Sequence, residues 1–270
     1  MGYNREMENL KIDDLGRNGF RLYQDDSIFK LGTASVLLAW FAASFIRQGH
    51  ADKARMLELG SGIGSAAMCA AARLPVTKID CIELQEKPFE ILLKNIELNH
   101  TGDRMRAFNC DLRDLPAEVK AESYDVVFMN PPFFSDRRGP ATDTDRNSTE
   151  TLVSRFGGDD LLEAFVSTAS KRTRTSGGFT VMCMTAERLP ECLESFKRNG
   201  LAPSRLINVH STADKDSFLS LLAGKKGSPN ADFRVLPPLI LSETDDNGNN
   251  VRTARYAAIY EEEHKDCFIS

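Results

Sequence analysis

Residues 55–72 read RMLELGSGIGSAAMCAAA, and this stretch decides the fold. Its first five residues are mostly apolar and fit a buried strand. The three glycines within 60–64 let the backbone turn tightly and approach a ligand, and the alanines of 65–72 let a helix lie close to a sheet. The stretch predicts a strand, a ligand-binding turn and a helix, which together open a doubly wound α/β fold.

The same alternation of strands and helices continues to residue 184. Apolar runs predict further strands at 78–84, 104–109, 126–129 and 179–184. Helices are predicted after the second strand, with Pro88 in the first turn, and at 159–171. A further helix is predicted to be opened by Thr185 and Pro190 and closed by Gly200. Extended runs at 204–210 and 217–223 predict an antiparallel edge hairpin, and 231–241 is extended as well. We therefore expect one mostly parallel sheet with an antiparallel edge.

The chain before residue 51 predicts a small N-terminal extension. Residues 1–18 are polar, and we expect them to be frayed at the start. Two short runs at 20–23 and 28–31 predict a hairpin. Thr33 can cap the helix that follows, which is apolar nearly all round and should pack on the main domain. We divide the chain into an extension at 1–50, a main domain at 51–262 and a tail at 263–270; the extension is either a structural lid or a contact to the ligand.

Composition narrows the class of protein. The 270 residues suffice for one large domain, and the net charge of −5 argues against a general nucleic-acid binder, although it allows a local basic patch. The six cysteines are scattered without a C-x-x-C, and the four histidines form no metal motif, so we expect reduced core cysteines and no metal. The polar start is no signal peptide, and no apolar run is long enough to cross a membrane. A cytoplasmic location is expected.

Acidic residues stand near the carboxyl ends of the predicted strands. Glu58 stands two residues before Gly60, where it would repel a phosphate but can bind an ammonium group. Glu83 lies 23 residues after Gly60, close to the spacing of an acid that binds ribose hydroxyls. Asp111 follows the third strand. A glycine loop alone also fits nicotinamide dehydrogenases, other nucleotide binders and simple tight turns.

Residues 124–134 read YDVVFMNPPFF and end a buried strand abruptly. The two prolines lack the N–H that a sheet needs, and the residue before a proline is held extended, so Asn130 stands at the strand end with its side chain off the sheet. The Asn130 carboxamide, the Pro131 carbonyl and the Phe133 ring would form a planar slot that accepts hydrogen bonds from an amino group on a flat ring. The alternative is a mere strand terminator.

Together these motifs resemble those of a known family. ELGSGIG at 58–64 resembles motif I of the class I S-adenosylmethionine-dependent methyltransferases, and NPPF at 130–133 resembles the motif of their amino-methylating members. The chain is similar in particular to the bacterial tRNA1(Val) adenine-N6 methyltransferases over about 15–262. The outer parts of this resemblance are KLGTASVLL at 30–38, GPA at 139–141, and the segments 224–227, 233–241 and 255–256. Two departures are Ala34 in place of the family's acid, which Asp25 or Asp26 could replace, and GNNV at 248–251 in place of a Tyr-Thr.

The resemblance implies a Rossmann-like sheet of seven strands, S-adenosylmethionine as cofactor and an adenine of a tRNA anticodon loop as substrate. It implies cofactor contacts at Gly32, Thr33, Glu58, Gly60, Ser61, Gly62, Gly64, Glu83, Leu84, Asp111, Leu112 and Asn130. It implies catalytic roles for Asn130, Pro131, Pro132 and Phe133. Contacts to RNA are expected at Phe134, Arg137, Arg138 and Arg146, and at Lys225 and Lys226 in a predicted hairpin turn.

The sequence leaves several alternatives open for the substrate and the function. The slot also fits a guanine N2 amine of ribosomal RNA or a glutamine amide of a release factor, and a cofactor-binding module without catalysis belongs to another class. The polar segment 135–158 lacks periodicity, and loops of this length are often functional, so we expect a substrate loop that orders on RNA. We expect tRNA as the partner, no membrane and a monomer.

Overall fold

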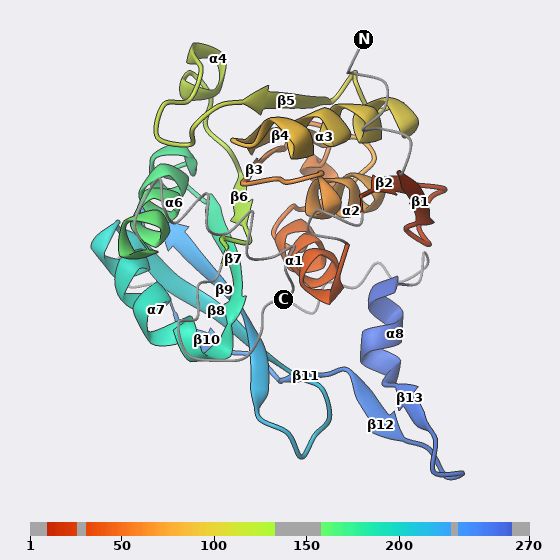
Figure 1. Cartoon of the computed structure of the whole chain (residues 1–270). Helices are drawn as coiled ribbons and strands as arrows, with labels where there is room; N and C mark the ends of the chain where they lie inside the picture. The colour runs from red at the N-terminus through yellow and green to blue at the C-terminus, as the bar shows by residue number, and fades with distance from the viewer. Residues whose placement is uncertain (1–9, 26–30, 133–157, 228–231, 261–270) are drawn as a thin grey trace.

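The computed structural model describes residues 10–25, 31–132, 158–227 and 232–260 (Figure 1). Its centre is a sheet of nine described strands in the order β10-β8-β9-β7-β6-β3-β4-β5, with β11 also paired to β8. The strands of this sheet are β3 (Arg55–Leu59), β4 (Lys78–Glu83), β5 (Met105–Asn109), β6 (Val126–Met129), β7 (Phe179–Thr185), β8 (Leu201–His210), β9 (Ser217–Lys226), β10 (Arg234–Val235) and β11 (Leu239–Ile240). Strands β3 to β7 are parallel, and β9 is antiparallel to both β7 and β8.

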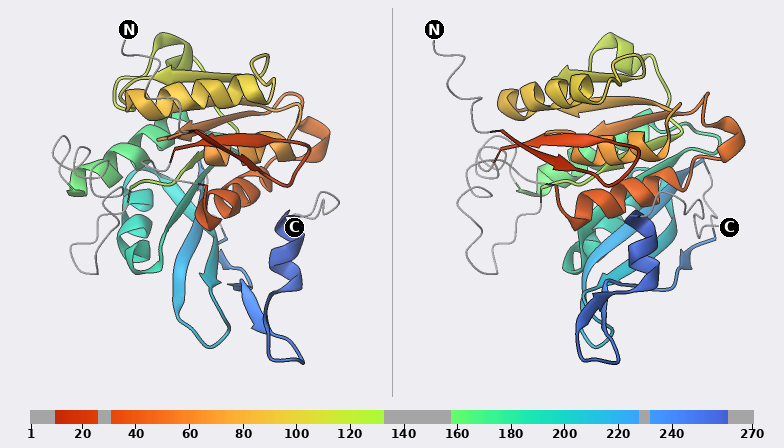
Figure 2. Two further views of the ribbon diagram at one scale, coloured as in Figure 1. Left: turned by 45° about the vertical axis from the view of Figure 1, so that its right-hand side comes forward. Right: turned by 90° about the vertical axis from the view of Figure 1, so that its right-hand side faces the viewer.

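Helices cover both faces of the sheet and give three layers (Figure 2). The helices are α1 (Thr33–Ala43), α2 (Ser65–Arg73), α3 (Glu86–Leu98), α4 (Ala117–Lys120), α6 (Gly158–Arg172), α7 (Leu189–Arg198) and α8 (Ala254–Tyr260), with short 3-10 turns η1 (Gln48–His50) and η2 (Ala186–Arg188). Residues of α1, α2, α3 and α8 share one apolar core, and residues of α4, α6 and α7 share the other. Alternate side chains of β6 divide between the two cores, as the period of a strand requires.

The predicted fold class is confirmed, and many element bounds agree. Strands β3 and β6 have the predicted ends, and the edge hairpin of β8 and β9 is antiparallel as expected. The expectation of seven strands was incomplete. Two short strands from the extended segment 231–241, β10 and β11, pair in parallel with the outer edge of β8. Two-residue strands bury too little for a sequence pattern to mark them.

The N-terminal prediction needs correction. Strand β2 (Arg21–Gln24) pairs antiparallel with β1 (Lys11–Asp14), which lies within the polar segment 1–18, where no strand was predicted. All four residues of β1 are exposed, so no apolar alternation marks it. Gly16, Asn18 and Gly19 adopt positive φ angles in the turn between the two strands. Residues 28–30 of the other predicted run lie outside the described residues, and Leu31 is not in a strand.

Helix α1 is a buried part of the main core. The cap position is Gly32, in extended backbone and without a side-chain hydrogen bond, so the prediction that Thr33 caps the helix was wrong. Nine of the helix residues, 35–43, are buried. The helix packs against α2, β6 and β7, where its all-round apolar surface finds cover. The division of the chain at residues 50 and 262 stays a prediction.

The last described segment forms a ribbon and a helix. Strands β12 (Ser242–Thr244) and β13 (Asn250–Arg252) pair antiparallel, and Figure 2 shows this hairpin extending from the body of the domain. The Asp245 carboxylate accepts hydrogen bonds from the N–H groups of Asn247 and Asn249, which closes the turn between the two strands. Helix α8 follows, and its Ile259 carbonyl accepts hydrogen bonds from Arg17 and Arg73. No described helix is long and apolar enough to cross a membrane.

Candidate active site

The carboxyl ends of the parallel strands bring most of the predicted residues to one edge of the sheet. Gly60 follows β3, Glu83 ends β4, Asp111 stands two residues after β5 and Asn130 follows β6. These strands are neighbours in the order β6-β3-β4-β5. Ligands of open α/β sheets bind beyond this edge, where the chain turns from strand to helix. The four motifs that the sequence separates by 70 residues therefore meet at one site.

The glycine loop turns at three positive φ angles, at Gly60 (69°), Gly62 (55°) and Gly64 (85°). A Cβ atom on Gly60 would lie 2.9 Å from the Phe165 ring, and one on Gly64 would lie 2.5 Å from Leu92 Cδ1. A Cβ on Gly62 would meet no atom within 4 Å. Gly60 and Gly64 thus serve packing, and Gly62 leaves open space in which a ligand can approach the backbone.

Glu83 is held at the end of β4 by backbone donors. Its Oε2 accepts from the Gly62 N–H at 2.7 Å and its Oε1 from the Gln85 N–H at 2.8 Å. The residue is 5% exposed, and burial raises the pKa of its carboxyl while these N–H groups oppose the rise. Each carboxylate oxygen has a second lone pair, which can accept from a hydroxyl group of a ligand.

Glu58 lies under the loop. Its Oε2 accepts from the Ala67 N–H of α2 at 3.1 Å, and the residue is 4% exposed. Burial raises the pKa of this carboxyl well above its ordinary value. Ser61 is buried and donates from Oγ to the Glu58 carbonyl, which ties the loop to the strand before it. A cationic group beside this carboxylate would favour its charged form.

Asp111 is paired in this structure. Both of its carboxylate oxygens accept hydrogen bonds from the Arg113 guanidinium, with Oδ2 at 2.8 Å from Nη2. Its Oδ1 also accepts from the backbone N–H of Arg113. The neighbouring Leu112 is half-buried, and its carbonyl accepts from Thr168 of α6. Leu84 packs against the second core. Asp111 is therefore at the predicted edge, and its carboxylate carries a partner from its own loop.

Asn130 supplies an unsatisfied acceptor at this edge. Its Oδ1 is buried and has no hydrogen-bond partner among the described residues. Pro131, which follows it, is buried and Pro132 is half-buried. A buried oxygen without a partner costs free energy, and native chains rarely keep one without use. The atom stands where an incoming amino group would need an acceptor.

The remaining predictions divide into two groups. Phe133, Phe134, Arg137, Arg138, Arg146 and the expected loop 135–158 lie largely outside the described residues, except for Gly158, which begins α6. Gly32 caps α1, and Thr33 Oγ1 lies 3.4 Å from the Tyr256 hydroxyl of α8. Asp25, a candidate for the acid that Ala34 replaces, forms an ion pair with Lys87 at 2.8 Å.

The placement of Lys225 and Lys226 was wrong. They end β9 and do not form a hairpin turn. Lys225 pairs with Phe179, the first residue of β7, so it lies at the amino edge of the parallel strands, opposite to Asn130. Lys226 donates to the Ser170 carbonyl of α6. Their supposed proximity to the slot, which was the reason to expect RNA contacts, is contradicted.

Two supporting residues escaped the sequence analysis. Asn95 of α3 is fully buried; it donates to the Ile63 carbonyl of the glycine loop, and it both donates to and accepts from the backbone of Tyr23. Asn109 of β5 donates to the carbonyls of Glu83 and Leu84. A polar residue at an apolar position of α3 is a visible signal. The reach of Asn109 to β4 becomes evident only from strand pairing.

The assembled edge suits one kind of chemistry. It offers an acid for hydroxyl groups, an acid for an ammonium group and an open approach at Gly62. Beside them stands a carboxamide oxygen that can orient an amine. These groups fit S-adenosylmethionine, which carries a ribose, an ammonium and a transferable methyl group. Within the described residues no cluster of His, Cys, Asp or Glu could hold a metal ion.

Comparisons with known proteins agree with this chemistry. The family model "Methyltransferase small domain" matches residues 32–153. A protein of Yersinia pestis (strain Pestoides F), named "tRNA1(Val) (adenine(37)-N6)-methyltransferase", is 30% identical over 183 residues, 65% of this chain and 68% of that protein. A protein of the same name from Flavobacterium psychrophilum is 26% identical and covers 89% of this chain and 94% of its own length.

Among solved structures, a "predicted O-methyltransferase" from Agrobacterium tumefaciens has a similar fold, with a TM-score of 0.61. It is 24% identical, and the match covers 82% of this chain and 94% of that one.

Proposed function

Because the chain belongs to the tRNA1(Val) (adenine(37)-N6)-methyltransferase family, we propose that it methylates N6 of an adenine in a tRNA anticodon loop. It is a methyltransferase, and S-adenosylmethionine is its methyl donor. The observation that carries the proposal is the buried Asn130 Oδ1 at the carboxyl end of β6, which has no hydrogen-bond partner among the described residues. It lies at the same edge of the sheet as Gly60, Glu83 and Asp111, which stand at or just after the ends of β3, β4 and β5.

The cofactor contacts follow the chemistry of each side chain. Glu83 would accept from the ribose hydroxyls, Glu58 would favour the methionine ammonium, and Asp111 with Leu112 would lie beside the adenine. Gly62 gives the backbone room to approach. Gly32, Thr33, Ser61 and Leu84 are proposed as outer contacts. When bound, S-adenosylmethionine supplies an activated methyl group.

Asn130 and Pro131 prepare the amine. The exocyclic amine of adenine is a weak nucleophile because its lone pair is conjugated with the ring. Asn130 Oδ1 and the Pro131 carbonyl each accept a hydrogen bond from one of the two N–H groups of this amine. These bonds return electron density to the nitrogen and fix its direction of attack. No separate base is needed, since the methylated amine can lose its proton to water afterwards. Phe133 would stack on the base, a contact of about 1–3 kcal/mol.

The RNA is proposed to reach this slot from a loop. A base must leave its stack to enter such a slot, and unpaired loop nucleotides leave at the lowest cost. Phe134, Arg137, Arg138 and Arg146 follow the slot in sequence and are proposed to contact the RNA. We place the protein in the cytoplasm with its tRNA substrate and propose that it acts as a monomer.

Product identification tests the substrate. The protein is incubated with labelled S-adenosylmethionine and, in separate reactions, with tRNA, ribosomal RNA or release factor, and the methylated nucleoside or residue is identified. N6-methyladenosine in tRNA is expected. N2-methylguanosine in ribosomal RNA or methylglutamine in release factor would instead support one of the other amines that fit an Asn-Pro-Pro slot.

Asn130→Ala tests the role of the unsatisfied Asn130 Oδ1. We expect kcat to fall about 100-fold or more because the amine loses its orientation. The melting temperature should not fall, because Oδ1 has no partner to lose among the described residues. Asn208→Ala is the control: its Oδ1 accepts from Ser220 Oγ on the edge hairpin, so this variant should lose stability and keep activity. Full activity of Asn130→Ala would exclude the proposed role.

A further inference from the structure

Thr185 ends β7, and its hydroxyl oxygen is buried. Its Oγ1 has no hydrogen-bond partner among the residues that the structure describes, as is true of Asn130 Oδ1. A hydroxyl removed from water without a partner destabilises the folded chain. The other threonine of this strand, Thr180, is fully buried, and its hydroxyl bonds Thr173 Oγ1 at 2.8 Å. The unsatisfied hydroxyl is thus the one at the carboxyl edge.

Strand register places Thr185 and Asn130 on the same face of the sheet. Strands β6 and β7 are parallel neighbours in which Met129 pairs with Met182, so Asn130 is level with Cys183. Phe128 and Cys183 belong to the core under α1, and Met129 and Met182 belong to the other core. Side chains alternate along a strand, and both Asn130 and Thr185 stand two positions beyond a member of the α1 core.

The backbone keeps this alternation to the ends of both strands. Thr185 is extended, with φ −64° and ψ 143°, and Asn130 precedes a proline, which favours extended geometry. Both side chains therefore project from the face of the sheet that α1 covers. Thr185 lies two residues farther than Asn130 toward the carboxyl ends of the strands. The two unsatisfied atoms thus lie on one face at the carboxyl edge of two neighbouring strands.

Sheet order decides which ligand Thr185 faces. The residues proposed to contact the ribose, the ammonium and the adenine of the cofactor (Glu83, Glu58 and Asp111) stand in or just after β3, β4 and β5, on one side of Asn130. Strand β7 is on the other side of β6, away from the cofactor residues. A group at its end is placed to meet the methyl acceptor and not the donor.

We infer that the Thr185 hydroxyl donates a hydrogen bond to a ring nitrogen of the substrate base beside the amine that Asn130 holds. This inference rests on the proposed function. In adenine the ring nitrogens N1 and N7, on either side of the N6 amine, are both acceptors, and a hydroxyl can donate to either. Thr185 thus acts with Asn130 to fix the base in the slot.

The test uses the whole chain and a synthetic anticodon stem-loop RNA whose target position carries adenosine, 1-deazaadenosine or 7-deazaadenosine. Thr185→Val keeps the shape and removes the hydroxyl. On adenosine we expect kcat/KM to fall about 3- to 10-fold, as for one lost hydrogen bond. On the analogue that lacks the contacted nitrogen, wild type and Thr185→Val should be equal. Thr185→Ser should retain the wild-type kcat/KM.

Stability separates this role from a structural one. Thr185→Val should melt at the wild-type temperature or above it, because the lost hydroxyl had no partner. Thr180→Val is the matched control on the same strand. It loses its bond to Thr173 and should melt lower, with kcat/KM unchanged.

Two outcomes overturn the inference, and they differ from each other. If the wild type methylates adenosine and Thr185→Val is equally active, or is weakened to the same extent on all three RNAs, Thr185 does not contact a ring nitrogen. If the wild type forms no N6-methyladenosine in this RNA but methylates another acceptor, the proposed function is wrong and the contact falls with it.

Discussion

At the level of single residues, burial and backbone hydrogen bonds act in opposite directions on the carboxyl groups of two glutamates. Glu58 and Glu83 are both about one-twentieth exposed, and burial raises the pKa of each carboxyl. Backbone N–H groups of Ala67, Gly62 and Gln85 offset part of the desolvation. The free protein therefore holds these acids at a cost, which a bound ammonium or hydroxyl would reduce.

Glu58→Gln makes that cost measurable. Folding raises the pKa of the Glu58 carboxyl above its ordinary value of 4.5. The protonated carboxyl therefore contributes most to the free energy of unfolding below pH 4.5, and this contribution is lost as the pH rises through the pKa of the folded state. The variant has no such titration at this site. Its melting temperature relative to wild type should therefore increase as the pH is raised above 4.5. Glu97→Gln, at an exposed position of α3, controls for the loss of a charge. A Glu58→Gln difference that stays constant with pH would contradict the prediction.

At the level of elements, the glycine loop divides its tasks between positions. Gly64 adopts φ 85° and faces Leu92, whereas Gly62 adopts φ 55° and faces open space. Both substitutions to alanine meet backbone strain of about 1–2 kcal/mol, but only the one at Gly64 adds a steric clash.

We expect Gly62→Ala to fold with a modest loss of stability and to bind cofactor at least about tenfold more weakly, because a methyl group fills the approach to the backbone. Gly64→Ala should lose more stability than Gly62→Ala. Thermal unfolding and calorimetric titration with S-adenosylhomocysteine measure the two effects. Equal cofactor affinity of Gly62→Ala and wild type would show that no ligand approaches Gly62.

Helix α3 fastens the N-terminal strand to the site by two asparagines one turn apart. Asn95 exchanges hydrogen bonds with the backbone of Tyr23, and Asn99 does the same with Arg21. These side chains pair with alternate residues of β2 as a neighbouring strand would. Asn95 also holds Ile63 of the glycine loop, so it links the extension to the loop.

Asn95→Ala should cost about 2–3 kcal/mol of unfolding free energy, since it leaves the buried Ile63 carbonyl and the half-buried backbone groups of Tyr23 unpaired. Asn99→Ala, at a more exposed position, should cost less. Hydrogen exchange of the Tyr23 amide should accelerate in the first variant and change less in the second. Equal effects of the two substitutions would contradict the role of burial.

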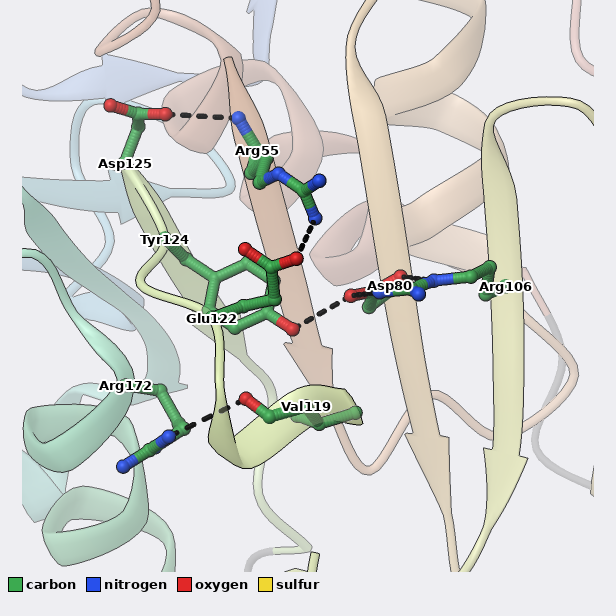
Figure 3. Close-up of polar contacts among 8 residues, drawn as sticks. All are labelled: Arg55, Asp80, Arg106, Val119, Glu122, Tyr124, Asp125 and Arg172. Carbon is green, nitrogen blue, oxygen red and sulfur yellow. Dashed lines mark hydrogen bonds and ion pairs between the residues drawn. The ribbon is translucent and has the colours of Figure 1, made fainter. Parts of the chain in front are cut away.

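For the whole molecule, the amino ends of the strands form a braced base opposite the site (Figure 3). Asp80 of β4 is 4% exposed and accepts from Arg106 of β5 at 2.7 and 2.6 Å and from the Tyr124 hydroxyl at 2.7 Å. Arg55 of β3 pairs with Glu122, and its N–H donates to Asp125. The strands that end in the site are thus fixed to one another at their other ends.

Arg106→Met should destabilise the chain more than Tyr124→Phe. Removal of the arginine leaves a buried carboxylate without its cation; we expect about 2–3 kcal/mol, below the value for a fully buried pair because Arg106 is half-exposed. Tyr124→Phe leaves Asp80 paired and should cost about 1–2 kcal/mol. Denaturant unfolding measures both. The prediction fails if the phenylalanine variant is the less stable.

The sequence by itself determined the strands, the loop and the chemistry of the edge. Strand and helix periods depend on neighbours in the chain, so β3, β6 and the helices α1, α2, α3, α6 and α7 could be predicted from local pattern, whereas the short helices α4 and α8 were not. Glycines that require positive φ and prolines that end a strand are local as well, and they marked the loop at 60–64 and the slot at Asn130.

Tertiary structure alone decided what depends on distant partners. The pairing of β1 with β2, the opposite-edge position of Lys225 and Lys226, and the reach of Asn95 and Asn109 follow from strand register and packing. Only register brings Asn130 and Thr185, far apart in sequence, to one face of one edge. The reason is physical: a local pattern fixes the direction of a side chain on its own strand, and only the order of strands in the sheet fixes its neighbours.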